Sequence, residues 1–390
     1  MSDKPTILVI HRGAAPPEQD TSLNLYHWLS DRLKGDLVTT SWDLTEEGLR
    51  TSQEGMGDFK YHRFPLHHRH FPISTIKNLY NLFGTAFRLL RKNKYDAIVT
   101  YGPYLNSIIA LVFRAIFKVP LIVQVPGHPV NGFISRQKHS FFSVMQIKKF
   151  ASKSVARFVC KRADYVKTLY PEQLESLGVK PSRLSTFHGW VPVTALSKNA
   201  PKKASEKKYI LTMGMPWYLK GVDLLIKAFH EIADDYPDLH LKVVGWEVVE
   251  REYFEGLAAN HPRIELCTPL EPADAHKVIA AAELFVLASR TEAMGRVLLE
   301  SMAFQVPIVA SRVDGIPHYM DDGVTGLLFE PGNYEDLTLK IREALDDEKA
   351  RQNRVKAAHE KILNVHNEQT FVREFANMVD EVVALNSHTE

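Results

Sequence analysis

The chain has few cysteines and no long apolar run. Its 390 residues include only two cysteines, Cys160 and Cys267, and neither has neighbours at metal-ligand spacing. This favours reduced thiols and a cytoplasmic compartment. No apolar run reaches the roughly 18 residues of a membrane-spanning helix, and the nearest approach, 108–117, is interrupted by Arg114. The N-terminus leads into the apolar run 6–10 without a signal-peptide layout. We expect a cytoplasmic protein that at most lies on a membrane surface.

Acidic residues are scarce in the first half. Residues 1–200 contain 27 Lys and Arg against 14 Asp and Glu, whereas the remainder contains 21 against 32. The halves therefore carry net charges of +13 and −11, although the whole chain carries only +2. A basic half indicates an anionic partner, either a membrane surface or nucleic acid. No recognisable nucleic-acid-binding motif accompanies the charge, so we expect no nucleic-acid partner.

The basic residues concentrate between 133 and 167, where nine Lys and Arg accompany one acid, Asp164. Four of them recur every four residues, which predicts a basic stripe along one helix: Lys149, Lys153, Arg157 and Lys161. Apolar and small residues mark roughly the other side, and we expect them to pack on the domain: Ile147, Phe150, Ala151, Ser154, Val155 and Phe158. Two interpretations remain open. In the first, the stripe and the basic stretches 67–70 and 88–94 form one surface that faces anionic lipid. In the second, the lysines are simply solvated.

Short apolar runs alternate with helical stretches in two series. This alternation predicts an α/β protein with two doubly wound parallel sheets, and 390 residues exceed one usual core. The stretch 192–208, rich in Lys, Ala, Ser and Pro, predicts a linker. The predicted organisation is a domain at 1–191, a second domain at 209–367, and a last helix at 368–390.

The stretch 288–303 lies between the apolar runs 284–287 and 306–310, as in a strand-loop-helix-strand unit. Ligands of such units bind beyond the carboxyl ends of the strands, and the first amides of the helix can hold an anion. Glu292 lies in the predicted loop, and Glu300 follows eight residues later in the predicted helix. Two acceptors at this separation suit a ligand with hydroxyls at both ends and phosphate between.

This stretch resembles the E-x7-E motif of retaining nucleotide-sugar glycosyltransferases of the GT-B fold, family 4. The resemblance continues through 311–320 and 322–332, and the stretch 214–229 is similar to a second motif of that family. It implies two Rossmann-like domains facing a central cleft. The first would bind the acceptor and the second the nucleotide sugar, with the last helix crossing back to the first domain.

The resemblance also implies a reaction. A sugar would pass from a nucleotide-diphosphate sugar to a hydroxyl of a glycan or glycolipid acceptor, with its anomeric configuration retained. Glu292 would bind hydroxyls of the transferred sugar, and Glu300 would bind the ribose. The other implied donor-binding residues are Gly214, Lys220, Arg290, Gly295 and Arg296. No cofactor or metal is implied, because cationic side chains and helix N-termini neutralise the leaving diphosphate. Consistently, the sequence has no Asp-x-Asp triplet, the usual metal motif of the other major glycosyltransferase fold.

Three positions depart from the family pattern. The first loop keeps only Gly13 of a glycine-rich loop. Pro126 stands where relatives have a histidine that contacts the donor sugar or the acceptor, and His128, two residues later, is the candidate catalytic residue. Met215 replaces an arginine of a cationic clamp, so donor binding is either weaker or served by Arg290 or Arg296. These departures leave two alternatives open: a non-catalytic sugar-nucleotide binder, or a sugar-nucleotide epimerase or sugar phosphorylase on the same architecture.

Overall fold

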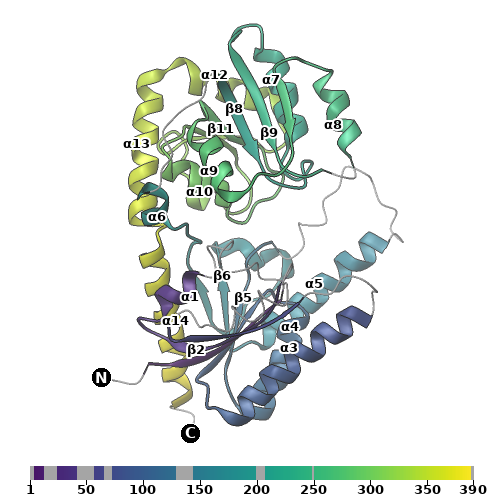
Figure 1. Ribbon diagram of the computed structural model, residues 1–390, viewed down its shortest axis with the longest axis vertical. Coiled ribbons are helices and arrows are strands. Elements are labelled where there is room, and N and C mark those ends of the chain that lie inside the picture. Colours follow the sequence, from purple (N-terminus) through teal and green to yellow (C-terminus); the bar gives the residue numbers. More distant parts are fainter. Residues whose placement is uncertain are drawn as a thin grey trace. The chain divides into compact units, whose positions relative to one another are not determined.

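The computed structural model describes residues 4–12, 24–41, 57–65, 73–128, 144–198, 207–247 and 250–387. These residues form two compact units. The first domain contains the described residues before 129, those from 144 to 187, and those from 368 onward; the second domain contains those from 188 to 367. Each domain is a parallel sheet with helices on both faces (Figure 1). The prediction of two Rossmann-like α/β domains is therefore confirmed.

The first sheet has seven parallel strands in the order β3-β2-β1-β4-β5-β6-β7. They are β1 (Thr6–Arg12), β2 (Lys34–Ser41), β3 (Phe59–Pro65), β4 (Ala97–Tyr101), β5 (Leu121–Gln124), β6 (Tyr165–Thr168) and β7 (Leu184–Thr186). The chain order reverses between β1 and β4, which makes that position the switch point where ligands of such sheets bind.

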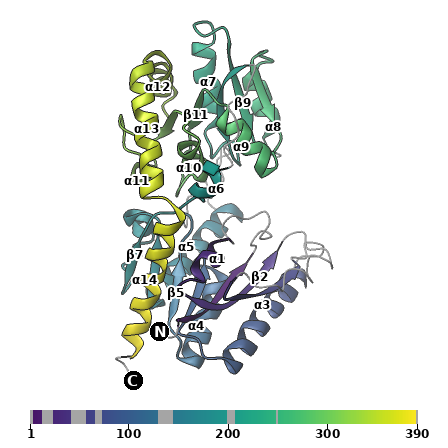
Figure 2. The same cartoon turned by 60° about the vertical axis from the view of Figure 1, so that its left-hand side comes forward.

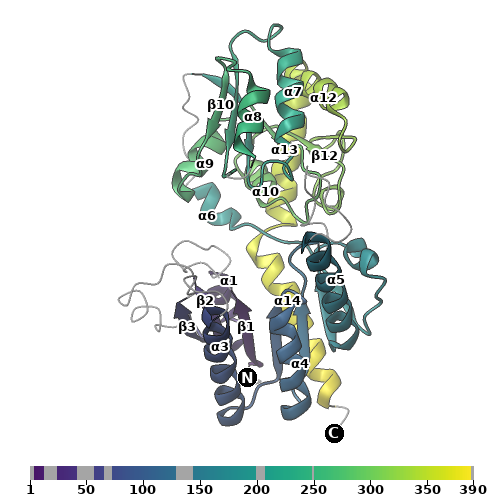
Figure 3. The ribbon, with the colours of Figure 1, turned by 90° about the vertical axis from the view of Figure 1, so that its right-hand side faces the viewer.

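Three helices lie side by side on one face of the first sheet (Figures 1 and 3): α3 (Ile73–Lys92), α4 (Leu105–Phe117) and α5 (Val144–Arg162). Leu82, Phe113 and Val159, one from each helix, belong to a common buried core with strand residues such as Leu8 and Val123. Helix α1 (Asn24–Leu29) packs instead with the C-terminal helix, and the short 3-10 helix η2 (Pro171–Leu177) follows β6.

The structure corrects the predicted orientation of α5. Its core-facing residues are Ala156, Val159 and Cys160. Ile147, Phe150 and Phe158, which we expected to pack on the domain, are exposed. Of the basic stripe, Lys153, Arg157 and Lys161 are exposed and Lys149 is half-buried. The helix carries two apolar stripes, and the stripe with the smaller side chains faces the core. The histidines of the stretch 67–70 lie outside the described residues.

The last helix, α14 (Glu368–Ser387), belongs to the first domain (Figure 2). The Tyr165 hydroxyl donates to Glu381 at 2.6 Å, and Arg32 pairs with Asp380 at 2.9 Å. Two residues of this helix, Phe375 and Val379, are fully buried. This is the placement that the resemblance implies for the C-terminal helix.

A lysine is buried where α14 meets β6. The Lys167 ammonium lies 4.4 Å from the ring centroid of Phe187 and 5.4 Å from that of Phe371, with 3% of the residue exposed. Burial lowers the pKa of Lys167 to about 7. An unfolded lysine has a pKa of about 10.4, so the unfolded state binds a proton that the native state releases above pH 7.

Lys167→Met is expected to raise the melting temperature at pH 7 by a few degrees. At pH 7 the free energy of unfolding of the variant should exceed that of wild type by at most about 4 kcal/mol. The two rings reduce this difference because they attract the lysine cation in wild type. Wild-type stability should rise from pH 7 to pH 10 through this group, so the advantage of the variant should shrink over that range. Melting curves of both proteins at both pH values test this. An advantage that is absent at pH 7, or equal at both pH values, would contradict it.

The second sheet has six parallel strands in the order β10-β9-β8-β11-β12-β13. They are β8 (Lys208–Met213), β9 (Leu239–Val244), β10 (Ile264–Cys267), β11 (Leu284–Leu287), β12 (Ile308–Ser311) and β13 (Leu327–Phe329). One face packs against α7 (Val222–Ile232), α8 (Arg251–Ala258) and α12 (Tyr334–Asp346). The other packs against α6 (Val193–Lys198), α9 (Pro272–Ala280), α10 (Arg296–Ala303), α11 (Ile316–Tyr319) and α13 (Glu348–Asn364).

The start of the predicted linker is corrected by helix α6. Val193 and Leu196 are buried in the core of the second domain together with Val191. Three apolar residues in six positions suffice to attach this short segment to the domain, although its overall composition is that of a linker. Residues 199–206 lie outside the described residues, and the division between the domains falls after Phe187.

Candidate functional site

Two loops meet at the switch point of the second sheet. The loop 214–221 follows β8 and the loop 288–295 follows β11, and these strands are neighbours at the position where chain order reverses. The Arg290 amide donates to the Leu219 carbonyl at 2.8 Å, so the loops are in direct contact. The carboxyl ends of these two strands form the candidate site.

Glu292 is the centre of this site. Its Oε2 accepts from the Lys220 ammonium at 2.5 Å and from the Ser289 hydroxyl at 3.2 Å. Its Oε1 accepts from the Gly295 amide at 3.2 Å. The side chains of Lys220 and Glu292 are 21% and 13% exposed, so water reaches both but screens the pair only in part. The structure thus brings together three of the predicted site residues, with a cation and a helix N-terminal amide on one carboxylate.

Two glycines shape the site. A Cβ added at Gly214 would lie 2.9 Å from Lys220 Cε, so the glycine leaves room for the lysine chain. Gly295 has φ +68° at the start of α10, where most side chains are strained, and an added Cβ would lie 3.0 Å from Leu287 Cδ2. Both glycines thus have a steric role in their loops, and their contact with the donor stays a prediction.

Asp314 holds the Glu292 loop from the neighbouring strand end, and the sequence did not single it out. Its carboxylate accepts from the Thr291 hydroxyl and, at 3.0 Å, from the Glu292 amide. The Gly315 amide donates to the Glu292 carbonyl at 3.0 Å. The available signal was its place in the stretch 311–320, which carries part of the family resemblance.

Arg290, which was predicted to contact phosphate, is paired within the protein in this structure. Its guanidinium forms a bidentate pair with Asp223, with both contacts at 2.7 Å, and donates to the Tyr218 carbonyl at 2.6 Å. It also stacks on the Tyr218 ring at 3.9 Å. These contacts let Arg290 join the two loops, and its contact with phosphate stays a prediction.

Arg296 and Glu300 pair along one face of α10, with Arg296 Nε 3.0 Å from Glu300 Oε1. The Arg296 side chain is 38% exposed and that of Glu300 is 11% exposed. One Glu300 oxygen is occupied by this pair, and the exposed cation of Arg296 can approach an anion. The spacing of four residues explains the pairing.

The remaining predicted residues belong to the first domain. His128 is half-buried beyond the carboxyl end of β5, in a loop that Gln173 holds by donating to the Val125 and Gly127 carbonyls, each at 3.0 Å. Gly13 lies outside the described residues. At the switch point of this sheet the rings of His11 and Tyr101 stack with centroids 4.4 Å apart, a pair that sequence reasoning missed.

Met215 and Trp246 expose apolar surface beside the candidate site. They follow β8 and β9, and their side chains are more than half exposed, at 62% and 56%. The two positions are neighbours, because a Cβ at Gly245 would lie 2.1 Å from the Gly214 carbonyl oxygen. Glu247 fixes the turn by accepting from the Trp217 amide at 3.1 Å. The position that the family pattern gives to an arginine is therefore open to solvent.

Met215→Arg is expected to tighten the binding of a nucleoside diphosphate. An added charge-assisted contact contributes about 1.5–3 kcal/mol, or roughly tenfold to a hundredfold in Kd. Calorimetry on the variant measures this, with Met215→Leu as the uncharged control. Unchanged affinity in both variants would indicate that the diphosphate does not lie beside this position.

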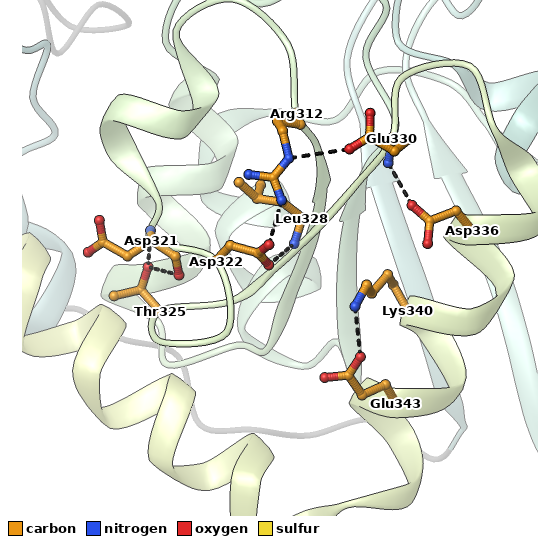
Figure 4. Close-up of polar contacts among 9 residues, drawn as sticks. All are labelled: Arg312, Asp321, Asp322, Thr325, Leu328, Glu330, Asp336, Lys340 and Glu343. Atoms are coloured by element: carbon orange, nitrogen blue, oxygen red, sulfur yellow. Dashed lines mark hydrogen bonds and ion pairs between the residues drawn. The ribbon is translucent and has the colours of Figure 1, made fainter.

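The stretch 322–332 has a structural role. Asp322 accepts from the Leu328 amide at 2.8 Å and pairs with Arg312, which also reaches Glu330 at 3.6 Å (Figure 4). Burial alone would raise the pKa of Asp322, but these donors lower it below its ordinary value. The Asp321 amide donates to the Thr325 hydroxyl at 2.8 Å in the same turn. The network fixes the connection from α11 to β13 and contributes no group to the Glu292 site.

Neither a metal-binding cluster nor a membrane-spanning helix occurs among the described residues. No group of three or more His, Cys, Asp and Glu side chains there is arranged to hold a metal ion. No helix of that part of the chain combines the length and apolarity needed to cross a membrane.

Residues 194–361 match the family described as Glycosyl transferases group 1. The matched residues lie within the second domain, so the similarity to this family covers that part of the chain. The chain is 26% identical over 327 residues to the sulfoquinovosyl transferase SQD2 of Arabidopsis thaliana, covering 80% of this chain and 62% of that protein. It is 27% identical over 197 residues to the lipopolysaccharide core biosynthesis glycosyltransferase LpsE of Rhizobium meliloti, covering 49% and 56%. The chain thus spans less than two thirds of these two relatives.

Solved structures extend the similarity to the whole chain. Sucrose-phosphate synthase from Thermosynechococcus elongatus superposes with a TM-score of 0.77 at 16% identity, covering 98% of this chain and 100% of that one. Anabaena HepE, in complex with UDP and glucose, gives a TM-score of 0.71 at 16% identity, with 97% and 100% covered. At this identity the likeness establishes the fold, and the two domains are those of the GT-B fold.

Proposed function

We propose that the chain is a glycosyltransferase that moves a sugar from a nucleotide-diphosphate sugar to a hydroxyl acceptor, with retention of anomeric configuration. The observation that carries the proposal is the contact of Glu292 with both Lys220 and the Gly295 amide, at the switch point of a domain that matches group 1. This arrangement offers a carboxylate for sugar hydroxyls and positive groups for a diphosphate.

The proposed donor lies across the ends of β8 and β11. The Lys220 ammonium would turn from Glu292 toward the diphosphate, joined by the first amides of α10 and the exposed Arg296 cation. Glu292 would then accept from the transferred sugar, and Glu300 from the ribose. Positive charge at the leaving diphosphate comes from the protein in this scheme, so no metal is required.

The proposed acceptor is a glycolipid or a precursor of a cell-surface polysaccharide, bound through the first domain. Relatives named for sulfoquinovosyl transfer and lipopolysaccharide core synthesis support this class. His128 remains the candidate for an acceptor-side or catalytic contact because its loop follows β5 at the carboxyl edge of that sheet. We further propose that the enzyme works in the cytoplasm, attached peripherally to the inner face of a membrane.

The test is a transfer assay with a panel of nucleotide sugars, beginning with UDP-glucose. Nucleoside diphosphate should be released rapidly only when a suitable lipid-linked acceptor is added, and the product should show the donor's anomeric configuration by NMR. Activity should persist in a chelator. Rapid nucleotide release or donor isomerisation without acceptor would favour the epimerase or phosphorylase alternative, and saturable binding without turnover would favour a non-catalytic binder.

A further inference from the structure

Apolar side chains gather on the outer surface of helices α3, α4 and α5. Each helix exposes large side chains at helical spacing, among them Tyr80 on α3 at 77%, Ile116 on α4 at 58% and Phe150 on α5 at 74%. These helices also expose Phe87, Leu105, Val112, Ile147 and Phe158. The three helices lie side by side on one face of the first sheet (Figure 3), so these residues belong to one surface. We call it the α3–α5 face.

The charged residues of these three helices all have one sign, although Arg114 of α4 pairs with Asp164, which follows α5. The three helices contain eleven Lys and Arg and no Asp or Glu. Within the described residues, no acidic side chain pairs with any of the six cations of α5: Lys148, Lys149, Lys153, Arg157, Lys161 and Arg162. An ordinary solvated helix of this protein differs, since α13 mixes acidic residues such as Glu348 and Glu360 with its basic ones. Exclusion of acids from three adjacent helices indicates an anionic partner.

Cations and apolar side chains alternate on the face. On α5 the Arg162 guanidinium stacks over the exposed Phe158 ring at 4.0 Å, and Lys153 and Arg157 lie between Phe150 and Phe158 in the sequence. A nucleic acid would be matched by the charge alone and would leave the aliphatic residues without a partner. A bilayer of anionic lipids matches both, because its phosphates meet the cations and its acyl boundary takes up the apolar side chains.

We propose that the α3–α5 face docks on an anionic lipid bilayer by inserting its exposed apolar side chains while its cations pair with lipid headgroups. This proposal rests on the proposed function in that it names the membrane partner of the glycosyltransferase. The docking itself does not depend on the transfer reaction and can be measured without it. Binding then has two separable parts. Each cation near the surface contributes about a fivefold increase in partitioning, which salt screens. Each inserted large side chain contributes about tenfold, which salt leaves intact.

The experiment is co-sedimentation of the full chain with vesicles of phosphatidylcholine alone or of an equal mixture with phosphatidylserine, at low and high salt. The apolar variant changes Ile116, Ile147 and Phe150 to Ser. The charge variant changes Lys148, Lys153, Arg157 and Lys161 to Gln, with Lys148 chosen because Lys149 is half-buried. The matched control changes Leu339 and Leu363 to Ser, two exposed apolar residues of the second domain.

Wild type and control should bind the anionic vesicles, with a reduced fraction remaining bound at high salt. The apolar variant should lose that salt-resistant fraction, and the charge variant should lose at least a hundredfold of the preference for anionic vesicles. Equal melting temperatures would exclude misfolding as the cause. The proposal is wrong if wild type stays in the supernatant, or if the apolar variant sediments like wild type at high salt. Self-association of wild type that the apolar variant abolishes, without vesicle binding, would instead make the face an interface between copies.

Discussion

Glu292→Gln is expected to lower turnover by about a hundredfold or more while leaving donor binding nearly unchanged. The substitution keeps the shape of the side chain but removes the negative charge of the carboxylate. That carboxylate accepts hydrogen bonds from the Lys220 ammonium at 2.5 Å and from the Gly295 amide at 3.2 Å. An interaction that is stronger in the transition state than in the ground state appears in kcat, and losses of this size follow removal of one such group. The freed lysine can still hold the diphosphate, so the donor KM should change little.

Glu300→Gln provides the contrast for this measurement. Its carboxylate pairs with Arg296 at 3.0 Å and is proposed to bind the ribose, away from the reacting carbon. We expect its donor KM to rise about tenfold with a smaller change in kcat. Glu255→Gln is the control, because Glu255 forms a comparable pair with Arg251 at 2.7 Å on the surface helix α8. Small and equal effects of the Glu292 and Glu300 substitutions on kcat and KM would contradict the assigned roles.

Lys220→Met is expected to weaken the binding of nucleoside diphosphate by about tenfold to a hundredfold. A charge-assisted hydrogen bond contributes roughly 1.5–3 kcal/mol, and the variant also leaves the Glu292 carboxylate without its cation, close to an incoming anion. Both effects act against the diphosphate. Calorimetric titration with UDP and related diphosphates measures the loss of affinity.

Lys227→Met is the matched control for this substitution, since Lys227 is an exposed lysine on the adjacent helix α7. Lys220→Arg should recover part of the affinity, because the charge is restored although Gly214 leaves a narrow passage for the side chain. If Lys220→Met and Lys227→Met bind UDP alike, the ammonium of Lys220 does not contact the diphosphate.

The two sheets and the centre of the site could be predicted from the sequence. Buried parallel strands appear as short continuous apolar runs. The predicted runs 284–287 and 306–310 contain β11 and all but the last residue of β12, and both strands are fully buried. The loop that carries Glu292 follows directly from its place after such a strand. Its contact with Lys220, which lies 72 residues away in the sequence, could be expected only through the family resemblance.

Roles that depend on long-range partners could not be predicted. Arg290 lies in a loop for which the resemblance implies phosphate binding, and only the structure reveals that Asp223, on helix α7, pairs with its guanidinium. Asp314 acts through the backbone of a neighbouring loop, and nothing in its local sequence indicates that contact. In both cases the deciding partner lies on another element at the same edge of the sheet.

The orientation of α5 illustrates a limit of amphipathic patterns. Lysines every four residues predicted an opposite apolar face that packs on the domain, but Ala156 and Val159 are buried while Ile147 and Phe150 are exposed. The stripe with the smaller side chains faces the core, and the stripe with the larger ones is exposed. A helix with two apolar stripes cannot be oriented from periodicity alone.

The thermal shift of wild type and of Lys220→Met with a panel of nucleotide-diphosphate sugars tests the central claim most directly, because a ligand that binds only the native state raises the melting temperature by mass action. We predict that at least one such sugar raises the melting temperature of wild type by several degrees, and that Lys220→Met loses most of this shift. If no nucleotide sugar shifts wild type, or if both proteins shift equally, the donor does not bind at the Glu292 site.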